Sequence, residues 1–180
     1  SAHALELLLW RGHHVLITGP TGTALISGQH AVKVLCHRYP VHELTVRVFL
    51  GTGKTALIKQ RLSNAVLPLA TAPYISLSFS AQTSAKQTQD IIESRLDKRR
   101  TGGLGPPPAH RVVIFVDDLN MPAPQQYGAQ PPIELLRQWM DHGGWYDTKT
   151  STLTTIADVQ FVASMGPPGG GRNPVTARYT

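Results

Sequence analysis

The sequence contains a single cysteine, Cys36, and no long apolar run. One cysteine excludes a disulfide within the chain and is typical of a reducing compartment. No apolar run approaches the roughly 20 residues that cross a bilayer, and the first residues carry no cleavable signal pattern. We therefore expect no membrane contact. A start at Ser1 rather than at methionine is what a fragment of a longer protein would show.

Acidic residues are also scarce, with 11 Asp and Glu against 17 Lys and Arg, which gives a formal net charge of +6. A basic balance permits an acidic partner such as nucleic acid, tubulin or nucleotide, but it selects none of them. The charges are scattered rather than striped along one face, which disfavours a nucleic-acid-dependent ATPase. We expect no nucleic-acid partner. The 180 residues suffice for one core of ordinary domain size.

The most informative feature that is present is a phosphate-binding loop divided in two. An apolar run over 14–18 leads into Gly19-Pro20-Thr21, and Gly51-Thr52-Gly53-Lys54-Thr55 follows after a long excursion. Removing 22–50 joins the two parts into the pattern G-x-x-x-x-G-K-[ST]. Because Gly-Thr occurs at both edges, removing 23–51 or 24–52 gives the same loop.

The chemistry of such a loop requires these residue types. Glycines let successive backbone N–H groups wrap the phosphates, and the helix that follows points its N-terminus at the anion. Lys54 would reach the β- and γ-phosphates, and the Thr55 hydroxyl would bind Mg²⁺. The alternative is a Gly-Thr-Gly turn before an ordinary helix. The upstream half and the preceding strand favour the nucleotide interpretation.

A second candidate site follows the apolar run 111–116, which ends in Asp117-Asp118. A Walker B segment has this form: Asp117 would hold the Mg²⁺ shell, and Asp118 would orient or deprotonate the attacking water. Asp118 is one methylene shorter than the glutamate usual at this position, and a small displacement there reduces the rate. The alternative is a pair of surface aspartates at a strand end.

The remaining pattern predicts alternating strands and helices. We expect strands at 13–18, 74–80, 111–116 and 156–163, and helices at 4–10, 56–66, 84–100 and around 133–140. Ser84 and Gln87 would form a capping box, and the basic end of that helix, 98–100, would complement its dipole. This order predicts a parallel sheet with helices on both faces, with ligands at the carboxyl ends of the strands. Gly19, Asp117 and Gly166 follow such ends.

Four longer strings resemble the dynein heavy chains: VDDLNMP at 116–122, YGAQPPIELLRQW at 127–139, DHGGWYD at 141–147 and ASMGPPGGGRNPVT at 163–176. More narrowly, they are similar to the third AAA+ module of the motor ring in the axonemal members. The stretches 92–100 and 105–107 fit the same module. The resemblance covers nearly everything except roughly 22–50, and these strings are far more specific than either Walker motif.

The resemblance implies an ATP-driven, minus-end-directed microtubule motor that moves cilia and flagella. Its six-module ring hydrolyses ATP mostly at the first module, and the third module binds nucleotide and gates the cycle. The implied cofactors are ATP or ADP and Mg²⁺. The implied partners are neighbouring AAA+ modules of the same heavy chain, dynein intermediate and light chains, and microtubules. The implied location is the cytoplasmic cytoskeleton, in the axoneme of a cilium or flagellum.

Carried over by position, the resemblance assigns the phosphate loop to Gly19, Pro20, Thr21, Gly51, Thr52, Gly53, Lys54 and Thr55. It assigns Walker B to Asp117 and Asp118. The sensor-I position falls near Gly166, which has no side chain. Arg172 and Asn173 are nearby polar candidates, or else simple loop residues. Residues 1–180 would form a single AAA+ large subdomain, a P-loop NTPase fold, with the helical lid, linker and stalk absent.

Residues 22–50 depart from the family pattern, and we expect them to be an aberrant insertion. The stretches 32–35 and 44–50 have β-like composition, which permits a hairpin over Tyr39-Pro40. The spacing of the candidate zinc ligands fits no standard finger; these are His30, Cys36, His37 and His42. Since removal restores the loop without loss or gain of a residue, our hypothesis is translated non-coding sequence, from a retained intron or a gene-model error.

An interrupted loop cannot hold consecutive N–H groups around one phosphate chain, so the chain as written should bind ATP weakly or not at all. This leaves hydrolysis by this chain uncertain. It also leaves a second function open: a regulatory or structural ring module that does not bind nucleotide.

Overall fold

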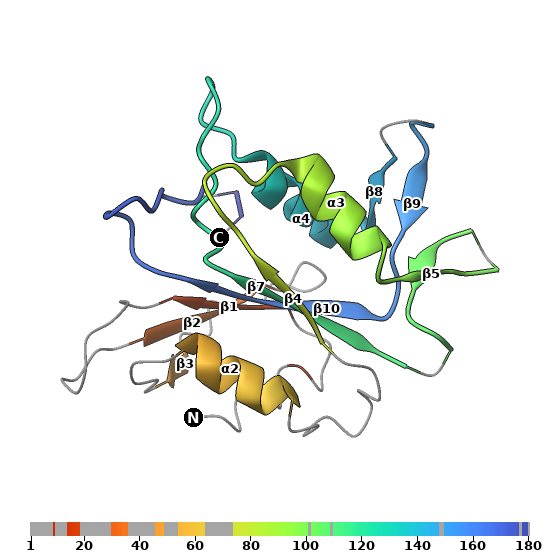
Figure 1. Cartoon of the computed structure of the whole chain (residues 1–180), viewed down its shortest axis with the longest axis horizontal. Coiled ribbons are helices and arrows are strands. Elements are labelled where there is room, and N and C mark those ends of the chain that lie inside the picture. The colour runs from red at the N-terminus through yellow and green to blue at the C-terminus, as the bar shows by residue number, and fades with distance from the viewer. Residues whose placement is uncertain are drawn as a thin grey trace.

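The computed structural model describes most of the chain. The described residues are Leu9, 14–18, 30–35, 46–48, 54–63, 74–100, 102–108, 110–147, 150–176, 178 and 179. Side-chain surroundings are not described for 30–35, 46–48, 54, 57, 61 and 63. The main sheet lies between helix α2 on one face and helices α3 and α4 on the other (Figure 1). The expected α/β architecture with helices on both faces is confirmed.

Four parallel strands form the part of the sheet that the sequence predicted. Their order is β1 (His14–Thr18), β10 (Val159–Met165), β7 (Val112–Asp117) and β4 (Ile75–Ser78). Every neighbouring pair among them is parallel. Strand β7 is apolar at every position before Asp117 because both of its faces are covered.

Two antiparallel strands extend this sheet beyond β1. Strand β2 (His30–Leu35) pairs with β1, and β3 (Val46–Val48) pairs with β2. The β-like composition of the segment 22–50 therefore does produce a pair of antiparallel strands. The expected turn at Tyr39-Pro40 lies outside the described residues.

Alternate residues along the parallel strands point to opposite faces, as the period of a strand requires. On one face, Ile58 of α2 (Lys54–Ser63) packs against residues from three strands. That cluster contains Leu9, Val15, Ile17, Val113, Phe115 and Val162. Of the helix expected at 4–10, Leu9 alone is described, and it is helical.

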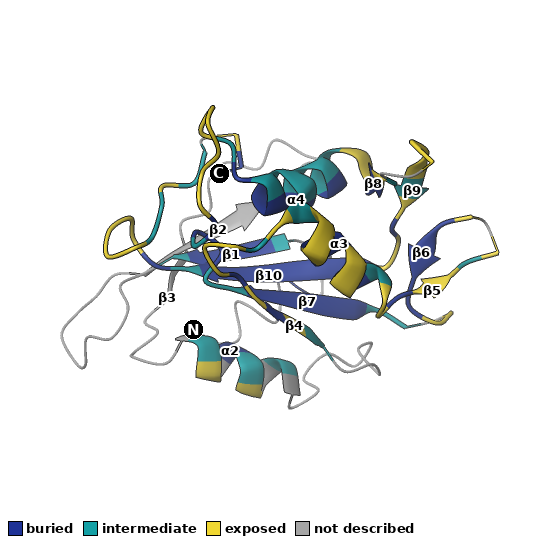
Figure 2. Cartoon of the chain, turned by 45° about the horizontal axis from the view of Figure 1, so that its top comes forward, coloured by how far each residue is buried: buried dark blue, intermediate teal, exposed yellow. Residues whose placement is uncertain are grey.

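The opposite face carries the larger cluster, built by α3 (Ala85–Glu93) and α4 (Pro131–His142) (Figure 2). The expected apolar stripe of α4 is buried at Ile133, Leu136 and Trp139. The Trp139 ring lies 5.5 Å from the Phe161 ring and 5.9 Å from the Trp145 ring, measured between centroids. No described helix is long and apolar enough to span a bilayer.

The start of α3 follows the prediction, but its end does not. The capping box is present: the Gln87 amide donates to Ser84 Oγ at 3.1 Å, and the Ser84 amide donates to Gln87 Oε1 at 3.1 Å. The helix stops at Glu93 instead of continuing to Arg100. The predicted interaction of 98–100 with the helix dipole is therefore wrong.

Helix α3 ends early because the chain after it forms a small antiparallel pair of strands. These strands are β5 (Asp97–Lys98) and β6 (Leu104–Gly105). Gly102, with φ of 85°, lets the chain reverse between the two strands. The Arg99 guanidinium instead binds the Asp158 carboxylate at 2.7 Å, next to the start of β10.

A second unpredicted pair, β8 (Gly144–Tyr146) and β9 (Leu153–Thr155), follows α4. Gly143, in the left-handed conformation, ends the helix. A Cβ on Gly144 would overlap the Thr154 carbonyl oxygen, so only glycine fits there. The strand expected at 156–163 begins later, at Val159, because Asp158 has φ of 56° and interrupts it.

Candidate functional site

The parallel strands bring the candidate residues to one edge of the sheet. The strands β1, β10, β7 and β4 run in the same direction, so their carboxyl ends meet at this edge. Strand β7 ends at Asp117, and β10 leads into the glycine-rich loop at 166–171, which lies at the left in Figure 1.

The Asp117 carboxylate is the centre of the described site. Its Oδ1 atom accepts hydrogen bonds from Thr55 Oγ1 at 3.0 Å and from Ser164 Oγ at 2.5 Å. The backbone amide of Asp118 donates to the same oxygen at 3.1 Å. Thr55 lies in the first turn of α2 and Ser164 in β10, so three separate elements converge on one carboxylate oxygen.

Ser164 was not among the residues that the sequence predicted for the site. Its side chain is buried and lies on the strand next to Asp117. The sequence feature that could have indicated this role is a hydroxyl near the end of an apolar strand, two residues before Gly166. A buried hydroxyl needs a hydrogen-bond partner, and the neighbouring carboxylate supplies it.

Asp118 faces a different partner. Its backbone has φ of 51°, a left-handed conformation that is uncommon outside glycine. Arg172 Nη2 donates to Asp118 Oδ1 at 3.2 Å. The Asp118 side chain is 39% exposed and the Arg172 side chain 23%, so solvent screens this ion pair only in part.

The loop that carries Arg172 is fixed against the segment after β7. Asn120 Nδ2 donates to the Gly166 carbonyl at 2.8 Å, and the Asn173 amide donates to the Asn120 carbonyl at 2.9 Å. Asn173 Nδ2 also donates to the Pro122 carbonyl at 3.0 Å. Arg172 and Asn173 thus make specific contacts, unlike simple solvated loop residues.

Several predicted site residues fall outside the part of the chain that the structure describes. Gly19, Pro20, Thr21, Gly51, Thr52 and Gly53 lie outside the described residues. Lys54 begins α2, and its side chain lies outside the described part. Among the candidate zinc ligands, His30 lies in β2, and Cys36, His37 and His42 are outside the described ranges. Within the described residues no group of three or more potential metal-binding side chains occurs.

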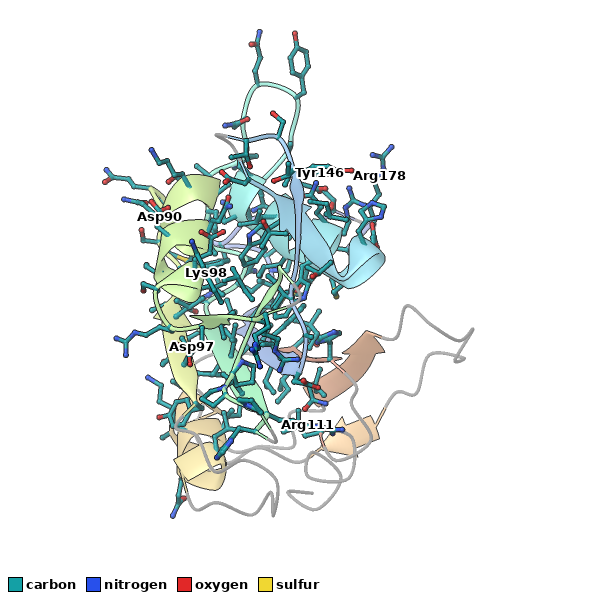
Figure 3. All side chains as sticks on the ribbon, turned by 90° about the vertical axis from the view of Figure 1, so that its right-hand side faces the viewer. Asp90, Asp97, Lys98, Arg111, Tyr146 and Arg178 are labelled. Carbon is teal, nitrogen blue, oxygen red and sulfur yellow. The ribbon has the colours of Figure 1, made fainter. Side chains whose placement is uncertain are left out.

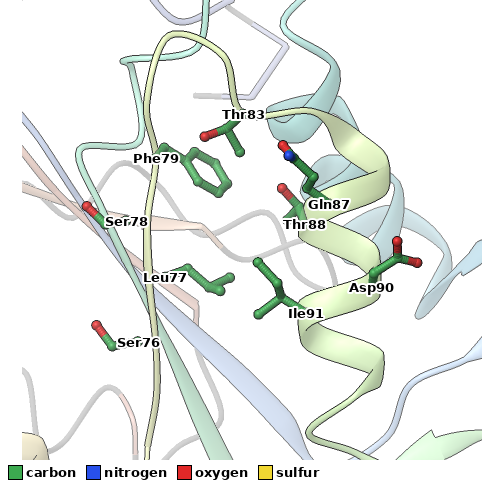
Figure 4. A pocket seen from close by; sticks show the side chains of 9 residues that line it. All are labelled: Ser76, Leu77, Ser78, Phe79, Thr83, Gln87, Thr88, Asp90 and Ile91. Atoms are coloured by element: carbon green, nitrogen blue, oxygen red, sulfur yellow. The ribbon is translucent and has the colours of Figure 1, made fainter.

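A separate hollow of about 460 Å³ lies between β4 and α3 (Figure 4). Its wall combines apolar side chains, including Leu77, Phe79 and Ile91, with hydroxyl and amide groups. None of the residues predicted to bind nucleotide lines it. The chemistry at the carboxyl edge of the sheet is therefore distinct from this hollow.

Comparison with known proteins identifies the family of this chain. Residues 42–180 match the family described as the P-loop containing dynein motor region. The chain belongs to the dynein motor-region family. The expected P-loop NTPase fold of the AAA+ type is confirmed by this match together with the parallel sheet.

Similar curated proteins include several axonemal dynein heavy chains. The chain is 59% identical to dynein axonemal heavy chain 1 of Mus musculus over 133 residues, which is 72% of this chain. It is 48% identical to the Homo sapiens protein of the same name over 180 residues, or 98% of this chain. It is 58% identical to dynein axonemal heavy chain 3 of Homo sapiens over 130 residues, or 72% of this chain. The chain spans about 3% of the length of each of these relatives.

Proposed function

We propose that this chain is a nucleotide-binding AAA+ module of an axonemal dynein heavy chain, and specifically the third module of its motor ring. The observation that carries the proposal is the hydrogen bond of 3.0 Å between Thr55 Oγ1 and Asp117 Oδ1. It joins the residue that ends the loop signature to the acid that ends the apolar strand, although 62 positions separate them.

The donor set at this point fits Mg²⁺. A threonine hydroxyl and a carboxylate are hard oxygen ligands, and Mg²⁺ bound to nucleotide uses one or two such protein groups together with phosphates and water. Thr55 and Asp117 would hold the ion, and Ser164 fixes the carboxylate through its bond of 2.5 Å. When bound, Mg²⁺ neutralises charge on the phosphates.

The remaining loop residues would bind the phosphates. Backbone amides of the loop would surround the phosphate chain, and Lys54 would contact its β and γ groups; these loop residues are Gly19, Pro20, Thr21, Gly51, Thr52 and Gly53. Asp118 would orient the attacking water. ATP and ADP are the proposed ligands.

At the level of the whole protein, we propose a part in an ATP-driven, minus-end-directed microtubule motor of the axoneme. The partners would be neighbouring AAA+ modules of the same chain, intermediate and light chains, and microtubules. The support is the match to the dynein motor region and the similarity to heavy chains named as axonemal. Residues 1–180 would form an AAA+ large subdomain.

A second function remains supported by particular observations: a ring module that transmits conformational change without binding nucleotide. Strands β2 and β3 continue the sheet beyond β1, and in the sequence they lie between the two halves of the predicted loop. Arg172 also binds one carboxylate oxygen of Asp118, the residue that would orient the attacking water.

The origin of residues 22–50 is a separate proposal. The mouse match covers 72% of the chain at 59% identity, whereas the human match that extends to 98% has 48% identity. The family match begins only at residue 42. The lower identity of the longer match favours an N-terminal part that is less family-like, in keeping with a retained intron or a gene-model error. The family match includes 42–50, so it supports this only for the residues before 42. Sequencing of transcripts across the junction decides this, because the hypothesis fails if every transcript encodes 22–50.

Titration with a fluorescent ATP analogue tests the magnesium site. We expect Asp117→Asn to lower affinity in the presence of Mg²⁺ and to have little effect in its absence. Asp97→Asn is the matched control, because Asp97 is exposed on β5, away from the sheet edge (Figure 3). Equal affinity of the parent chain and Asp117→Asn with Mg²⁺ present would contradict the proposal.

A further inference from the structure

Arg172 is the described cation in direct contact with the acid pair, and the proposed magnesium site gives it no task. Its Nη2 atom binds Asp118 Oδ1 at 3.2 Å. Asp118 in turn donates its backbone amide to the Asp117 carboxylate, which binds Thr55. The guanidinium therefore contacts the sequence neighbour of Asp117, the residue that would hold the metal ion of a bound nucleotide.

The guanidinium is incompletely satisfied where it lies. Arg172 Nε is buried and has no hydrogen-bond partner among the described residues. A buried donor without a partner destabilises the arrangement that holds it, and more so when the group is charged. The contact with Asp118 is also longer than the 2.7–2.9 Å that is usual for a charge-assisted bond. The guanidinium is thus held at Asp118 by a single long contact, which a stronger acceptor can replace.

The position of Arg172 depends on the absence of a side chain at Gly166. A Cβ built on Gly166 would lie 2.8 Å from both Cδ and Nε of Arg172. The Arg172 side chain therefore crosses the space that a side chain at the end of β10 would fill. The loop supports this path, because Gly169, Gly170 and Gly171 all have positive φ and Arg172 exchanges two backbone hydrogen bonds with Gly169.

We propose that Arg172 binds the terminal phosphate of a nucleoside triphosphate and leaves Asp118 when it does so. This inference rests on the proposed nucleotide site and assigns a specificity-determining residue to it. A terminal phosphate carries more negative charge than a carboxylate and offers three oxygens to the planar fork of the guanidinium. Transfer of the guanidinium to that phosphate frees Asp118 Oδ1, the oxygen that Arg172 had occupied, for the attacking water.

The consequence is discrimination between ATP and ADP. Without a terminal phosphate, Arg172 stays on Asp118 and contributes nothing to binding. With one, it exchanges a long, partly screened ion pair for a charge-assisted contact. A single contact of this kind changes affinity on the order of tenfold.

The test measures the affinities of the whole 180-residue chain for fluorescent ATP and ADP analogues with Mg²⁺. We expect Arg172→Ala to lower ATP affinity on the order of tenfold and to leave ADP affinity unchanged. Arg172→Lys should retain part of the preference, because it keeps the charge without the fork. Arg178→Ala removes the same charge at an exposed position and should change neither affinity (Figure 3).

Two further variants test the exchange itself. Gly166→Ala displaces the Arg172 side chain and should reduce the ATP preference in the same direction as Arg172→Ala. Asp118→Asn removes the competing carboxylate and should raise ATP affinity. In the Arg172→Ala background, Asp118→Asn should raise ATP affinity less. An equal rise in both backgrounds would instead show that the variant only removes repulsion between the Asp118 carboxylate and the phosphate.

The outcomes distinguish this inference from the proposed function. Equal losses of ATP and ADP affinity in Arg172→Ala would make Arg172 a structural residue and overturn the inference, while nucleotide binding by the parent chain would still support the site. Binding of neither nucleotide, both by the parent chain and by a version that lacks 22–50, would overturn both.

Discussion

The parallel and the antiparallel parts of the sheet differ in what they contribute to the site. The parallel part, β1-β10-β7-β4, sends its carboxyl ends to one edge and places Asp117 and Ser164 there. The antiparallel part, β2 and β3, continues the sheet beyond β1 within the segment that divides the predicted phosphate loop. One segment of the sequence can therefore extend a sheet by backbone pairing and also interrupt a ligand-binding motif.

The largest effect is expected from the core of the parallel part. Phe161 is fully buried and its ring stacks on that of His14, with 4.4 Å between centroids. Phe161→Ala should lower the free energy of unfolding by about 3–5 kcal/mol, because it leaves a cavity between β10 and α4. Chemical denaturation followed by tryptophan fluorescence measures the change. A loss below about 1 kcal/mol would contradict the proposed packing.

A proline in the antiparallel part should have a smaller effect. Val32 of β2 pairs with Ile17 of β1 and with Val46 of β3, and proline cannot donate to this ladder. We expect Val32→Pro to cost about 1–3 kcal/mol, typical of unpaired backbone groups. Trp139 and Trp145 should keep their native fluorescence, because they lie in α4 and β8, away from β2 and β3. Unfolding of the whole chain would show that both parts of the sheet are one cooperative unit.

The helix cap on the parallel part gives a smaller effect again. Ser84→Ala removes the acceptor for the Gln87 amide and should destabilise the chain by about 1 kcal/mol. The reciprocal bond from the Ser84 amide to Gln87 Oε1 survives that change. Gln87→Ala in the Ser84→Ala background should therefore add a further small loss. Strict absence of any effect of Ser84→Ala in thermal unfolding would show that the capping box does not stabilise α3.

The smallest effect at neutral pH concerns Tyr179, which packs into the cluster of the parallel part. Its hydroxyl is buried without a hydrogen-bond partner, and this burial raises the pKa of Tyr179 far above its ordinary value of 10.0. Tyr179→Phe should change stability at pH 7 by less than about 1 kcal/mol and in the favourable direction, since an unpaired buried hydroxyl is lost.

The pH dependence of the same variant has a definite sign. The folded chain keeps the Tyr179 proton at high pH, whereas the unfolded chain releases it above about pH 10. The parent chain should therefore lose stability as the pH rises above 10, and Tyr179→Phe should lose less. Denaturation curves at pH 8 and at pH 10.5 measure this difference. Parallel losses in the two proteins would exclude Tyr179 as the cause.

The sequence predicted the parallel part well because its signals are local. The buried run 111–116, the capping box at Ser84 and the apolar stripe of α4 each reflect a period or a cap that short windows contain. It mispredicted the end of α3, because helix propensity alone gave no sign that 97–98 would pair with 104–105. The pair β8 and β9 was missed for the same reason: pairing partners are set by tertiary contacts.

The site was predictable in part. Thr55 and Asp117 followed from motifs with a known spacing, and the structure brings them within 3.0 Å. Ser164 was missed because a single serine in an apolar strand has no motif of its own. The contact between Arg172 and Asp118 was equally invisible, because it depends on the loop geometry at 169–171 and on the empty space at Gly166. The roles of all these residues in binding nucleotide remain predictions.

Affinity for MgATP, measured on the whole chain and on a version that lacks 22–50, tests the central claim most directly. The account predicts weak binding by the whole chain and binding at least about tenfold tighter by the shortened one, because the deletion restores a continuous phosphate loop beside Thr55 and Asp117. Equal affinities, or no binding by the shortened chain, would contradict it.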